Sequence, residues 1–595
     1  MVKKAFGKFK RQNFVTGALT LAGAGILCRI IGVGFRIPFA NIIGNYGMGL
    51  YQMVFPLYAL LLILSSAGIP IAISKMVARA RAEQSPVGKS TPKTDSEDVL
   101  SNQKDESLDS VRADESGATR QAKRKRKSKR IEVYSPQKIL LNALVLLGTI
   151  GLIVSALFLI FARQIATLQG NVQITKIYLA IAPAVFLVCL ISAFRGYFQG
   201  LGNMIPTAIS QVVEQTVKVS VAITAAILLY PQGIYWAVFG AIAAITISEV
   251  AGLLLLIIIY IIHRKKIKQN TTYGEAEKEK NTLTKKAVPT NNKMKTISFA
   301  LMWDILKKSL PITAMAAIFP LILVFDSILV INMLEAGGAT TQVATQLYGI
   351  SSGTVHTLIN MPAILGIAIG TAVVPMTAKL LKQNKKDEVR DKFALAVKMI
   401  YIIAIFFALF YIVFGREIIT LLYSRAFKDN PDQLRIAANL LKIESAMILL
   451  MGLSQVFTAM LQGAGRAKFP LIALVIGGAV KVIFGLIFIR TSLGIYAVSI
   501  GNVLCFAIAF TLNAIFAIRF LNLSIKPKLR TLKLLAVLFV HAGVLVGLVF
   551  LLPQGKWWIV LGGAVAFIIY AAMVLGLRIF PLGKNSNKEV TSSAT

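Results

Sequence analysis

The chain has 595 residues, of which 56% are hydrophobic and only 15% are charged. About a quarter of the residues in a soluble globular domain are charged, so this composition excludes an ordinary soluble enzyme. The apolar residues form blocks long enough to cross a hydrocarbon core of about 30 Å as helices, and they predict an all-α polytopic membrane protein.

The formal net charge is +38, which in a soluble protein would first suggest binding to nucleic acid. The basic residues cluster between the apolar blocks, as at residues 123–127 and 264–266. Basic clusters beside membrane spans are typical of cytoplasmic loops. We therefore expect no nucleic-acid partner.

Fourteen apolar segments follow a basic start at residues 1–11. Each has about twenty or more mostly apolar residues, which is the length of a membrane span. The predicted spans are residues 15–43, 50–80, 138–161, 174–198, 206–230, 234–262, 302–334, 343–378, 393–415, 434–461, 470–490, 494–518, 534–552 and 557–579.

The connections between these spans differ in charge from one side to the other. With a cytoplasmic N-terminus, the inner segments hold 48 basic residues and the outer ones hold 7. This asymmetry predicts a multi-pass protein of the cell membrane with both termini in the cytoplasm. It also favours an even number of spans, because one missed helix would exchange the two sides downstream.

A hydrophilic insertion occupies residues 83–135 and is acidic at first and strongly basic afterwards. Such a segment cannot bury enough apolar surface to fold alone, so we predict a disordered cytoplasmic loop. Its basic half is expected to lie against anionic lipid head groups.

A short motif occurs twice, as QGLG at residues 199–202 and as QGAG at residues 462–465, each before a proline and a new span. A duplication into two pseudo-symmetric six-helix lobes plus two C-terminal helices would explain this repeat. The predicted parts are an N-lobe at 1–262 with its insertion, a cytoplasmic linker at 263–298, a C-lobe at 299–520, and two extra helices with a cytoplasmic tail at 521–595.

Two arginines lie in the first span. Arg29 and Arg36 are seven residues apart and therefore share one helix face within about 20°. Two guanidinium groups on one face suit phosphate oxygens, because each donates in a fork and stays charged. In the alternative, Arg29 pairs with a buried carboxylate and Arg36 extends to the membrane surface.

The fifth predicted span carries Gln211, Glu214, Gln215 and Lys218 at helical spacing, as one polar stripe. The stripe must face protein or water, so Gln211, Glu214 and Lys218 are candidate substrate-binding residues. In the alternative, Glu214 and Lys218 form a structural ion pair. Arg195 in the preceding span is expected to extend toward the inner surface.

Single ionisable residues interrupt other apolar stretches, namely Glu249, Asp326, Lys442, Glu444 and Lys481. An ionisable group inside a membrane usually faces a cavity or a partner, so each is a candidate for function or for pairing. Asp326 is included among the candidate substrate-binding residues.

The eighth predicted span presents Gln346, Gly349, Gly353, Thr357 and Asn360 on one face. Such small and polar residues either line a cavity or permit close helix packing. Thr357 and Asn360 are the candidate substrate contacts on this face. His356 lies off it and is expected to be a packing histidine rather than a proton carrier.

The sequence contains no apparatus for catalysis. It has no Walker lysine motif, no HExxH, no paired-carboxylate signature and no Asp-rich metal cluster. Cys28, Cys189 and Cys505 lie in separate apolar blocks without the spacing of metal ligands. We expect no enzyme activity, no cofactor and no bound metal.

Several segments together resemble a known family, namely residues 29–32 with Arg36, 44–47, 56–58, 68–70, 195–200, 361–375 and 462–465. They are similar to the polysaccharide-biosynthesis branch of the MOP exporter superfamily, in the group of stage V sporulation protein B and the lipid II flippases of Gram-positive bacteria. The likeness covers about residues 10–580. It implies two six-helix lobes, two further helices that form a groove for a polyprenyl tail, and a cationic cavity for a diphosphate-sugar head group.

The function implied by the resemblance is that of a flippase. It would move an undecaprenyl-diphosphate-linked saccharide, with lipid II as the favoured substrate, from the inner to the outer leaflet by alternating access. Proteobacterial flippases carry an acidic residue where this chain has residues 49–51, and arginines near Ile63 and Thr357. Another polyprenyl-linked polysaccharide unit, or a small molecule exchanged by a MATE-like antiporter, are the alternatives. Expected partners are the lipid-linked oligosaccharide, membrane lipids and proteins of cell-wall synthesis.

Overall fold

The computed structural model describes residues 14–66, 68–84, 134–279, 297–521, 529–551, 553 and 556–577. Every regular element within these ranges is helical, which confirms the predicted all-α class. Most of the predicted disordered insertion, from 85 to 133, and the tail from 578 onward lie outside the described residues.

The α-helices are α2 (Phe14–Ser66), α3 (Ile69–Gln84), α5 (Pro136–Ile160), α6 (Ala162–Leu168), α7 (Thr175–Gly200), α8 (Ile205–Leu229), α9 (Ile234–Glu279), α10 (Phe299–Ala336), α11 (Thr341–Tyr348), α12 (His356–Lys382), α13 (Lys386–Leu422), α14 (Pro431–Gly463), α15 (Lys468–Phe488), α16 (Tyr496–Leu521), α17 (Leu529–Leu551) and α18 (Lys556–Gly576). A π-helical turn, Gly349–Val355, joins α11 to α12.

The helices account for the fourteen predicted spans. Twelve stretches in the described part of the chain are long and apolar enough to cross a membrane, and the first of them, Leu19–Ala82, contains two predicted spans. The shorter apolar helix Leu535–Leu551 matches the thirteenth prediction. Several helices continue beyond their apolar run. The clearest is α9, which extends to Glu279 and so includes the first part of the predicted linker at 263–298.

Several helices begin at residues that satisfy their free amide groups. The side chains of Ser135, Ser298, Thr340 and Asn430 accept hydrogen bonds from the first turns of α5, α10, α11 and α14. Proline follows directly in α5 and α14, where its fixed φ suits the first helical position.

The first predicted span, at 15–43, is the first arm of α2. The second, predicted at 50–80, is divided between the second arm of α2, which ends at Ser66, and α3, which begins at Ile69. Gly44 has φ +66°, a left-handed conformation that glycine adopts readily, and it interrupts the helix at the predicted outer turn. The rings of Phe39 and Tyr51 lie 5.2 Å apart, and Arg36 lies over the ring of Phe55 at 5.9 Å. These pairs on either side of Gly44 place the arms antiparallel and side by side.

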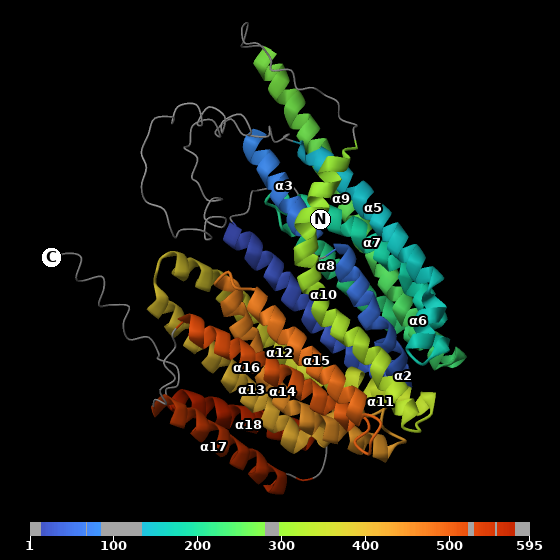
Figure 1. The fold of residues 1–595 in the computed structure, drawn as a ribbon, viewed down its shortest axis with the longest axis vertical. Coiled ribbons are helices and arrows are strands. Elements are labelled where there is room, and N and C mark those ends of the chain that lie inside the picture. The colour runs from blue at the N-terminus through green and yellow to red at the C-terminus, as the bar shows by residue number, and fades with distance from the viewer. Residues whose placement is uncertain are drawn as a thin grey trace, which may run out of the picture.

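The helices form two lobes with a pair of helices at one edge. In the first lobe α7 contacts α2, α3, α5 and α9, and in the second α14 contacts α12, α13 and α16. Figure 1 shows α10 and the first arm of α2 running between the two groups. The pair α17 and α18 packs on α13, where the His541 ring stacks on Phe406 and contacts Tyr570.

The repeated motif has the same conformation in both lobes. Gly202 has φ +76° and Gly465 has φ +75°, each at the turn between two long helices. An added Cβ at Gly200 would lie 2.6 Å from Val77 in α3, and one at Gly463 would lie 2.5 Å from the carbonyl of Val374 in α12. The duplication read from the sequence is therefore visible in the turns and in what they contact.

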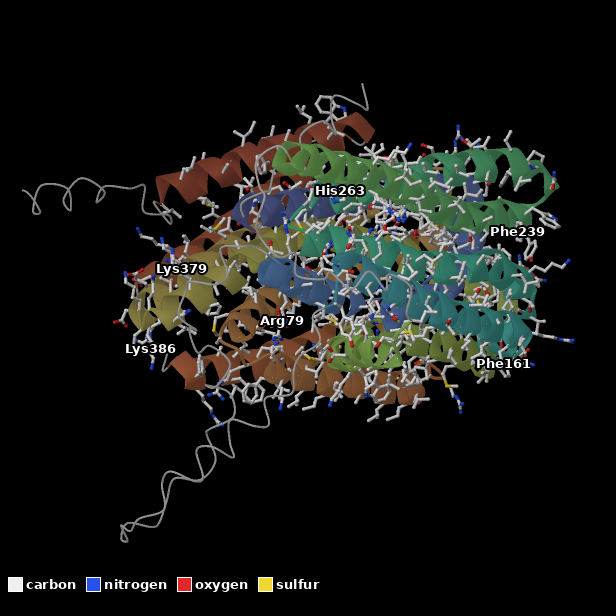
Figure 2. All side chains as sticks on the ribbon, turned by 90° about the horizontal axis from the view of Figure 1, so that it is seen from above. Arg79, Phe161, Phe239, His263, Lys379 and Lys386 are labelled. Atoms are coloured by element: carbon white, nitrogen blue, oxygen red, sulfur yellow. The ribbon has the colours of Figure 1, made fainter. Side chains whose placement is uncertain are left out.

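The two ends of the helices differ in the residues they present. Arg79, Lys379 and Lys386 lie toward one end in Figure 2, while Phe161 and Phe239 lie toward the other. We call these the basic end and the aromatic end. This placement agrees with the alternation of basic and non-basic connections along the sequence.

Candidate functional site

A cavity of about 170 Å³ lies between the two lobes and is called the central cavity below. Both arms of α2 form its wall on the N-lobe side, and helices α10, α11, α12, α14, α15 and α16, with the π-helical turn, form the wall on the C-lobe side. Its polar lining residues are Arg36, Gln52, Asp326, Tyr348, Ser352, His356, Asn360, Lys481 and Asn502.

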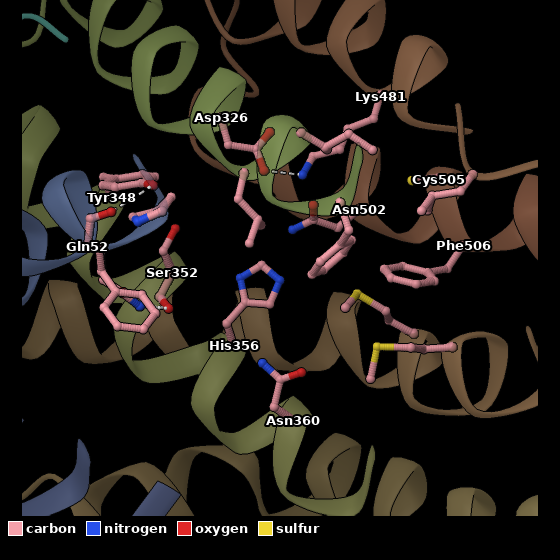
Figure 3. A pocket seen from close by; sticks show the side chains of 18 of the residues that line it. Gln52, Asp326, Tyr348, Ser352, His356, Asn360, Lys481, Asn502, Cys505 and Phe506 are labelled. Carbon is pink, nitrogen blue, oxygen red and sulfur yellow. Dashed lines mark hydrogen bonds and ion pairs between the residues drawn. The ribbon is translucent and has the colours of Figure 1, made fainter. Parts of the chain in front are cut away.

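An ion pair lies at one side of the central cavity. The ammonium of Lys481, on α15, donates to the carboxylate of Asp326, on α10, and each residue is only 7% exposed. Figure 3 shows this pair above Asn502 and His356. The sequence presents both residues as single charges, and the fold brings them together across 155 positions.

Arg36 supplies the second cation of the cavity. It is half-buried and comes from the first arm of α2, where its guanidinium lies over the ring of Phe55 at 5.9 Å. The residues that line the cavity include two cations, Arg36 and Lys481, and one carboxylate, Asp326. With a neutral His356 the lining therefore carries one net positive charge.

One face of the eighth span lines the cavity, and of the predicted face it includes Asn360 alone. Tyr348, Ser352, His356 and Asn360 all contribute to the lining. The ring of His356 faces the cavity (Figure 3), and its role as a packing residue rather than a proton carrier stays a prediction. The main chain of Ser352 also accepts a hydrogen bond from the Gln52 side chain on α2.

The glycines of the predicted face serve for close packing instead. An added Cβ at Gly349 would lie 2.1 Å from the Asn45 carbonyl, and one at Gly353 would lie 2.7 Å from Met48. Both contacts are with α2. Thr357 is fully buried and donates to the carbonyl of Gly353, so it does not line the central cavity.

A buried carboxylate lies behind the cavity wall. Glu444 on α14 is fully buried, and its Oε1 accepts hydrogen bonds from Ser499 at 2.7 Å and from Asn502 at 3.0 Å. Asn502 lines the cavity, so Glu444 orients one of its polar side chains.

The polar stripe on α8 pairs with α7 rather than within itself. Arg195 donates to Glu214 at 2.7 Å and to the Ser210 hydroxyl at 3.1 Å. The expected extension of Arg195 toward the surface is therefore wrong, and the alternative pair of Glu214 with Lys218 is replaced. Lys218 and Gln211 are half-buried on the same helix.

Glu249 lies in the same lobe and is 4% exposed. Its Oε1 accepts a hydrogen bond from the Tyr58 hydroxyl at 3.2 Å. Glu249 also interacts electrostatically with Glu214 and Arg195, so these three residues form an N-lobe polar cluster that is separate from the central cavity lining.

Arg29 has different surroundings from Arg36. It is exposed on α2, two turns nearer the start of the helix, and it is not among the residues that line the central cavity. The two arginines therefore do not face a single described cavity together.

A second cavity of about 610 Å³ adjoins the first within the C-lobe. The two share Phe319, Met451, Leu474 and Phe506 in their walls. The second cavity reaches Gln462, at the repeated turn, and contains the amide side chains of Gln455 and Asn513. Together the cavities lead from Arg36 toward the basic end.

Sequence reasoning missed Gln52, Ser352 and Asn502 as lining residues. They are uncharged, and no signal in a single sequence separates them from other polar residues in helices. Lys481 is visible in the sequence as a single charge in an apolar stretch, and such a charge indicates a residue that faces a cavity or a partner.

The comparisons with known proteins identify the family. The family described as "Polysaccharide biosynthesis protein" matches residues 14–93 and 117–381, and the family "MatE" matches residues 311–487. Stage V sporulation protein B of Bacillus subtilis (strain 168) is 28% identical over 523 residues, covering 87% of this chain and 86% of that protein.

Two further relatives share a printed name. The protein named lipid II flippase MurJ of Bacillus subtilis (strain 168) is 23% identical over 502 residues, covering 80% of this chain and 78% of that protein. The solved structure described as "Lipid II flippase MurJ, inward closed conformation" matches with a TM-score of 0.62 and 14% identity, covering 94% of this chain and all of that chain. The family model matches more than half of this chain, and this multi-pass membrane protein therefore belongs to the polysaccharide biosynthesis protein family.

Proposed function

We propose that the protein is a flippase for a saccharide linked to a polyprenyl lipid through a diphosphate. The central cavity carries the proposal, because it lies between the lobes and its lining has two cations against one carboxylate. A diphosphate needs such positive charge away from water, and guanidinium and ammonium groups supply it. The amides Gln52, Asn360 and Asn502 offer hydrogen bonds to sugar hydroxyls.

The candidate residues take different roles in this proposal. Arg36 and Asp326, with Lys481, act at the central cavity, and Asn360 contacts the sugar. Arg29, exposed two turns away, is the first cation that the head group meets on its way inward. Glu214, Lys218 and Gln211 belong to α8 and act through the packing of the N-lobe, and Thr357 supports the π-helical turn beside the cavity.

The direction of transport follows from charge. We assign the basic end to the cytoplasm, with both termini inside, on the rule that basic loops stay in the cytoplasm. The adjoining cavity leads the head group from this end to Arg36. Moving one elementary charge across 100 mV is worth about 2.3 kcal/mol, so a cell potential that is negative inside helps return an empty, positively charged cavity to the inward-facing state.

The lipid tail stays outside the polar cavities. We assign it to the edge formed by α17 and α18, which pack on α13 and present exposed Phe539, Phe550 and Phe567. Such side chains are compatible with an isoprenoid chain.

The favoured substrate is lipid II, and the named relative MurJ supports it. Another polyprenyl-linked polysaccharide unit is the alternative, which the sporulation protein and the matched family description favour. A small-molecule antiporter is the third candidate, which the MatE match favours.

Depletion of the flippases of a host cell tests these candidates. In depleted cells that lack this protein, the unflipped lipid-linked saccharide should accumulate, and mass spectrometry of the accumulated lipid identifies the substrate. Depleted cells that express this protein should export that saccharide. Arg36→Ala, expressed at the same level, is the control and should not restore export. Accumulation unchanged by the wild-type protein, together with resistance to small toxic cations, would favour the antiporter instead.

A further inference from the structure

Lys481 donates to Asp326, so it can bind an anionic ligand only if this ion pair opens. The pair is buried, and both side chains line the central cavity (Figure 3). Among the described residues, Lys481 is the hydrogen-bond partner found for Asp326. An anion that takes Lys481 would leave the carboxylate buried and without its cation.

A buried carboxylate without a partner is costly, and the cheaper outcome is that it binds a proton. We propose that Lys481 is a second ligand of the diphosphate, that Asp326 is its exchangeable partner, and that binding of the head group is accompanied by uptake of one proton at Asp326. The step is balanced, since the carboxylate and one proton from water form a carboxyl group and the ammonium keeps its charge. The inference rests on the proposed function.

Charge matching supports this exchange. A diphosphate that bridges a lipid and a sugar carries two negative charges near neutral pH. The empty cavity has Arg36, Lys481 and ionised Asp326, and so one net positive charge. With Asp326 protonated, the net charge becomes two positive, which equals that of the ligand in magnitude.

The groups around Asp326 allow this assignment. Lys481 on α15 and Arg36 on α2 are cationic, and the neighbours on α11 and α16 are the neutral Tyr348 and Asn502, with the thiol of Cys505 beside them.

In the described part of the chain, the hydrogen bonds that reach α10 from the start of α3, from α5 and from the segment after α6 are made by uncharged groups. Directly after α6, the amide of Gln169 donates to the hydroxyl of Ser327, which is adjacent to Asp326. The contacts of α3 and α5 lie near the start of α10, as at Gly68 with Thr313 and Asn142 with Ser298. His356 on α12 is the histidine of the cavity lining, and imidazole is the side chain whose ordinary pKa lies nearest to neutral pH.

Calorimetric titration tests the proposal. The probe is a farnesyl-diphosphate N-acetylglucosamine, a diphosphate diester that does not titrate near neutral pH, added to the full chain in detergent. Heats measured in two buffers of different ionisation enthalpy give the number of protons taken up. We expect about one proton for each ligand bound.

Variants assign the proton. Asp326→Asn should bind the probe with no proton uptake, and His356→Gln should keep the uptake. If Asp326→Asn does not fold because Lys481 is left without its anion, the neutral double variant Asp326→Asn/Lys481→Gln replaces it. That variant should lose the uptake and bind at least about tenfold more weakly, because it lacks one charged ligand.

The outcomes are distinct. Binding by the wild type without uptake of protons, or uptake that persists in the Asp326 variants, overturns this inference and leaves the flippase proposal standing. Proton uptake that is lost only in His356→Gln would assign the proton to the imidazole, and this result also overturns the inference. A folded wild-type protein that does not bind the probe contradicts the proposed function and this inference together.

Discussion

Arg36 and Arg29 belong to one helix face, yet the fold gives them different surroundings. Arg36 is half-buried and lines the central cavity, whereas Arg29 is exposed. A ligand in the cavity can therefore form a charge-assisted hydrogen bond with Arg36. Such a bond is worth about 1.5–3 kcal/mol, which corresponds to a change in affinity of about 10- to 100-fold.

We predict that Arg36→Ala reduces head-group binding by at least about tenfold while the protein still inserts and folds. Arg36→Lys should recover only part of the loss, because it keeps the charge and loses the fork. Ligand-dependent thermal stabilisation and folded yield, measured on the same sample, check this.

Arg29→Ala is the matched comparison and should affect transport rate more than binding. Unchanged binding in Arg36→Ala at normal yield would contradict the role of Arg36, and equal losses of binding in both variants would place both arginines at the head group.

At the scale of the elements, α2 is held to the C-lobe near the aromatic end. The Asn41 side chain donates to the Leu422 carbonyl at 2.7 Å and accepts from the amide of Arg425 at 3.0 Å. Asn45 donates to the Ala426 carbonyl at 3.2 Å and to Gln433 at 2.8 Å. Alternating access with an open aromatic end requires these four hydrogen bonds to break.

We predict that Asn41→Ala/Asn45→Ala shifts the protein toward a state open at the aromatic end. Each hydrogen bond contributes about 1 kcal/mol, so their loss should change the equilibrium by at least tenfold, a change of about 1.4 kcal/mol. With Cys28 and Cys189 replaced by alanine, Cys505 is the remaining thiol and it lines the cavity. Its labelling from outside by a membrane-impermeant maleimide should become at least about tenfold faster.

Asn439→Ala is the control, because Asn439 bonds to Tyr496 within the C-lobe at 3.5 Å. It should leave the labelling rate of Cys505 unchanged. Equal rates in the double variant and its parent would show that these asparagines do not hold the closed state.

For the whole molecule, the separation of the two ends predicts topology. Gln383 lies in the turn between α12 and α13, and Asp429 in the connection between α13 and α14, and both are exposed. The α12–α13 turn is flanked by Lys379 and Lys386, which lie at the basic end (Figure 2). The two positions are therefore a matched pair on opposite sides of the membrane.

In a variant without the three native cysteines, we predict that Asp429→Cys is labelled in intact cells and that Gln383→Cys is labelled only after permeabilisation. Labelling by an impermeant reagent, quantified before and after permeabilisation, checks this. The reverse result at both sites would invert the assigned direction of transport.

The sequence by itself determined the class, the spans and the duplication. Backbone groups inside a membrane must be satisfied within each segment, so a long apolar run has to be a helix wherever its neighbours lie. The repeated turns were equally readable, because Gly202 and Gly465 meet a local requirement for positive φ.

Only the tertiary structure decided which charged groups meet. Asp326 pairs with Lys481 on another helix. Glu214 pairs with Arg195 on α7, although Lys218 lies one turn away on the same helix as Glu214. Spacing along one helix describes neighbours on that helix alone, whereas a buried charge pairs with whatever side chain the packing brings to it.

The eighth span shows the same limit in its periodicity. The predicted face assumed 3.6 residues per turn, but the π-helical turn at Gly349–Val355 widens the repeat. Residues four apart, from Tyr348 to Asn360, then stay on one side and line the cavity with His356 among them. Gly349 and Gly353 of this turn contact α2 closely. A contact between segments so far apart in the chain cannot be predicted from the local sequence.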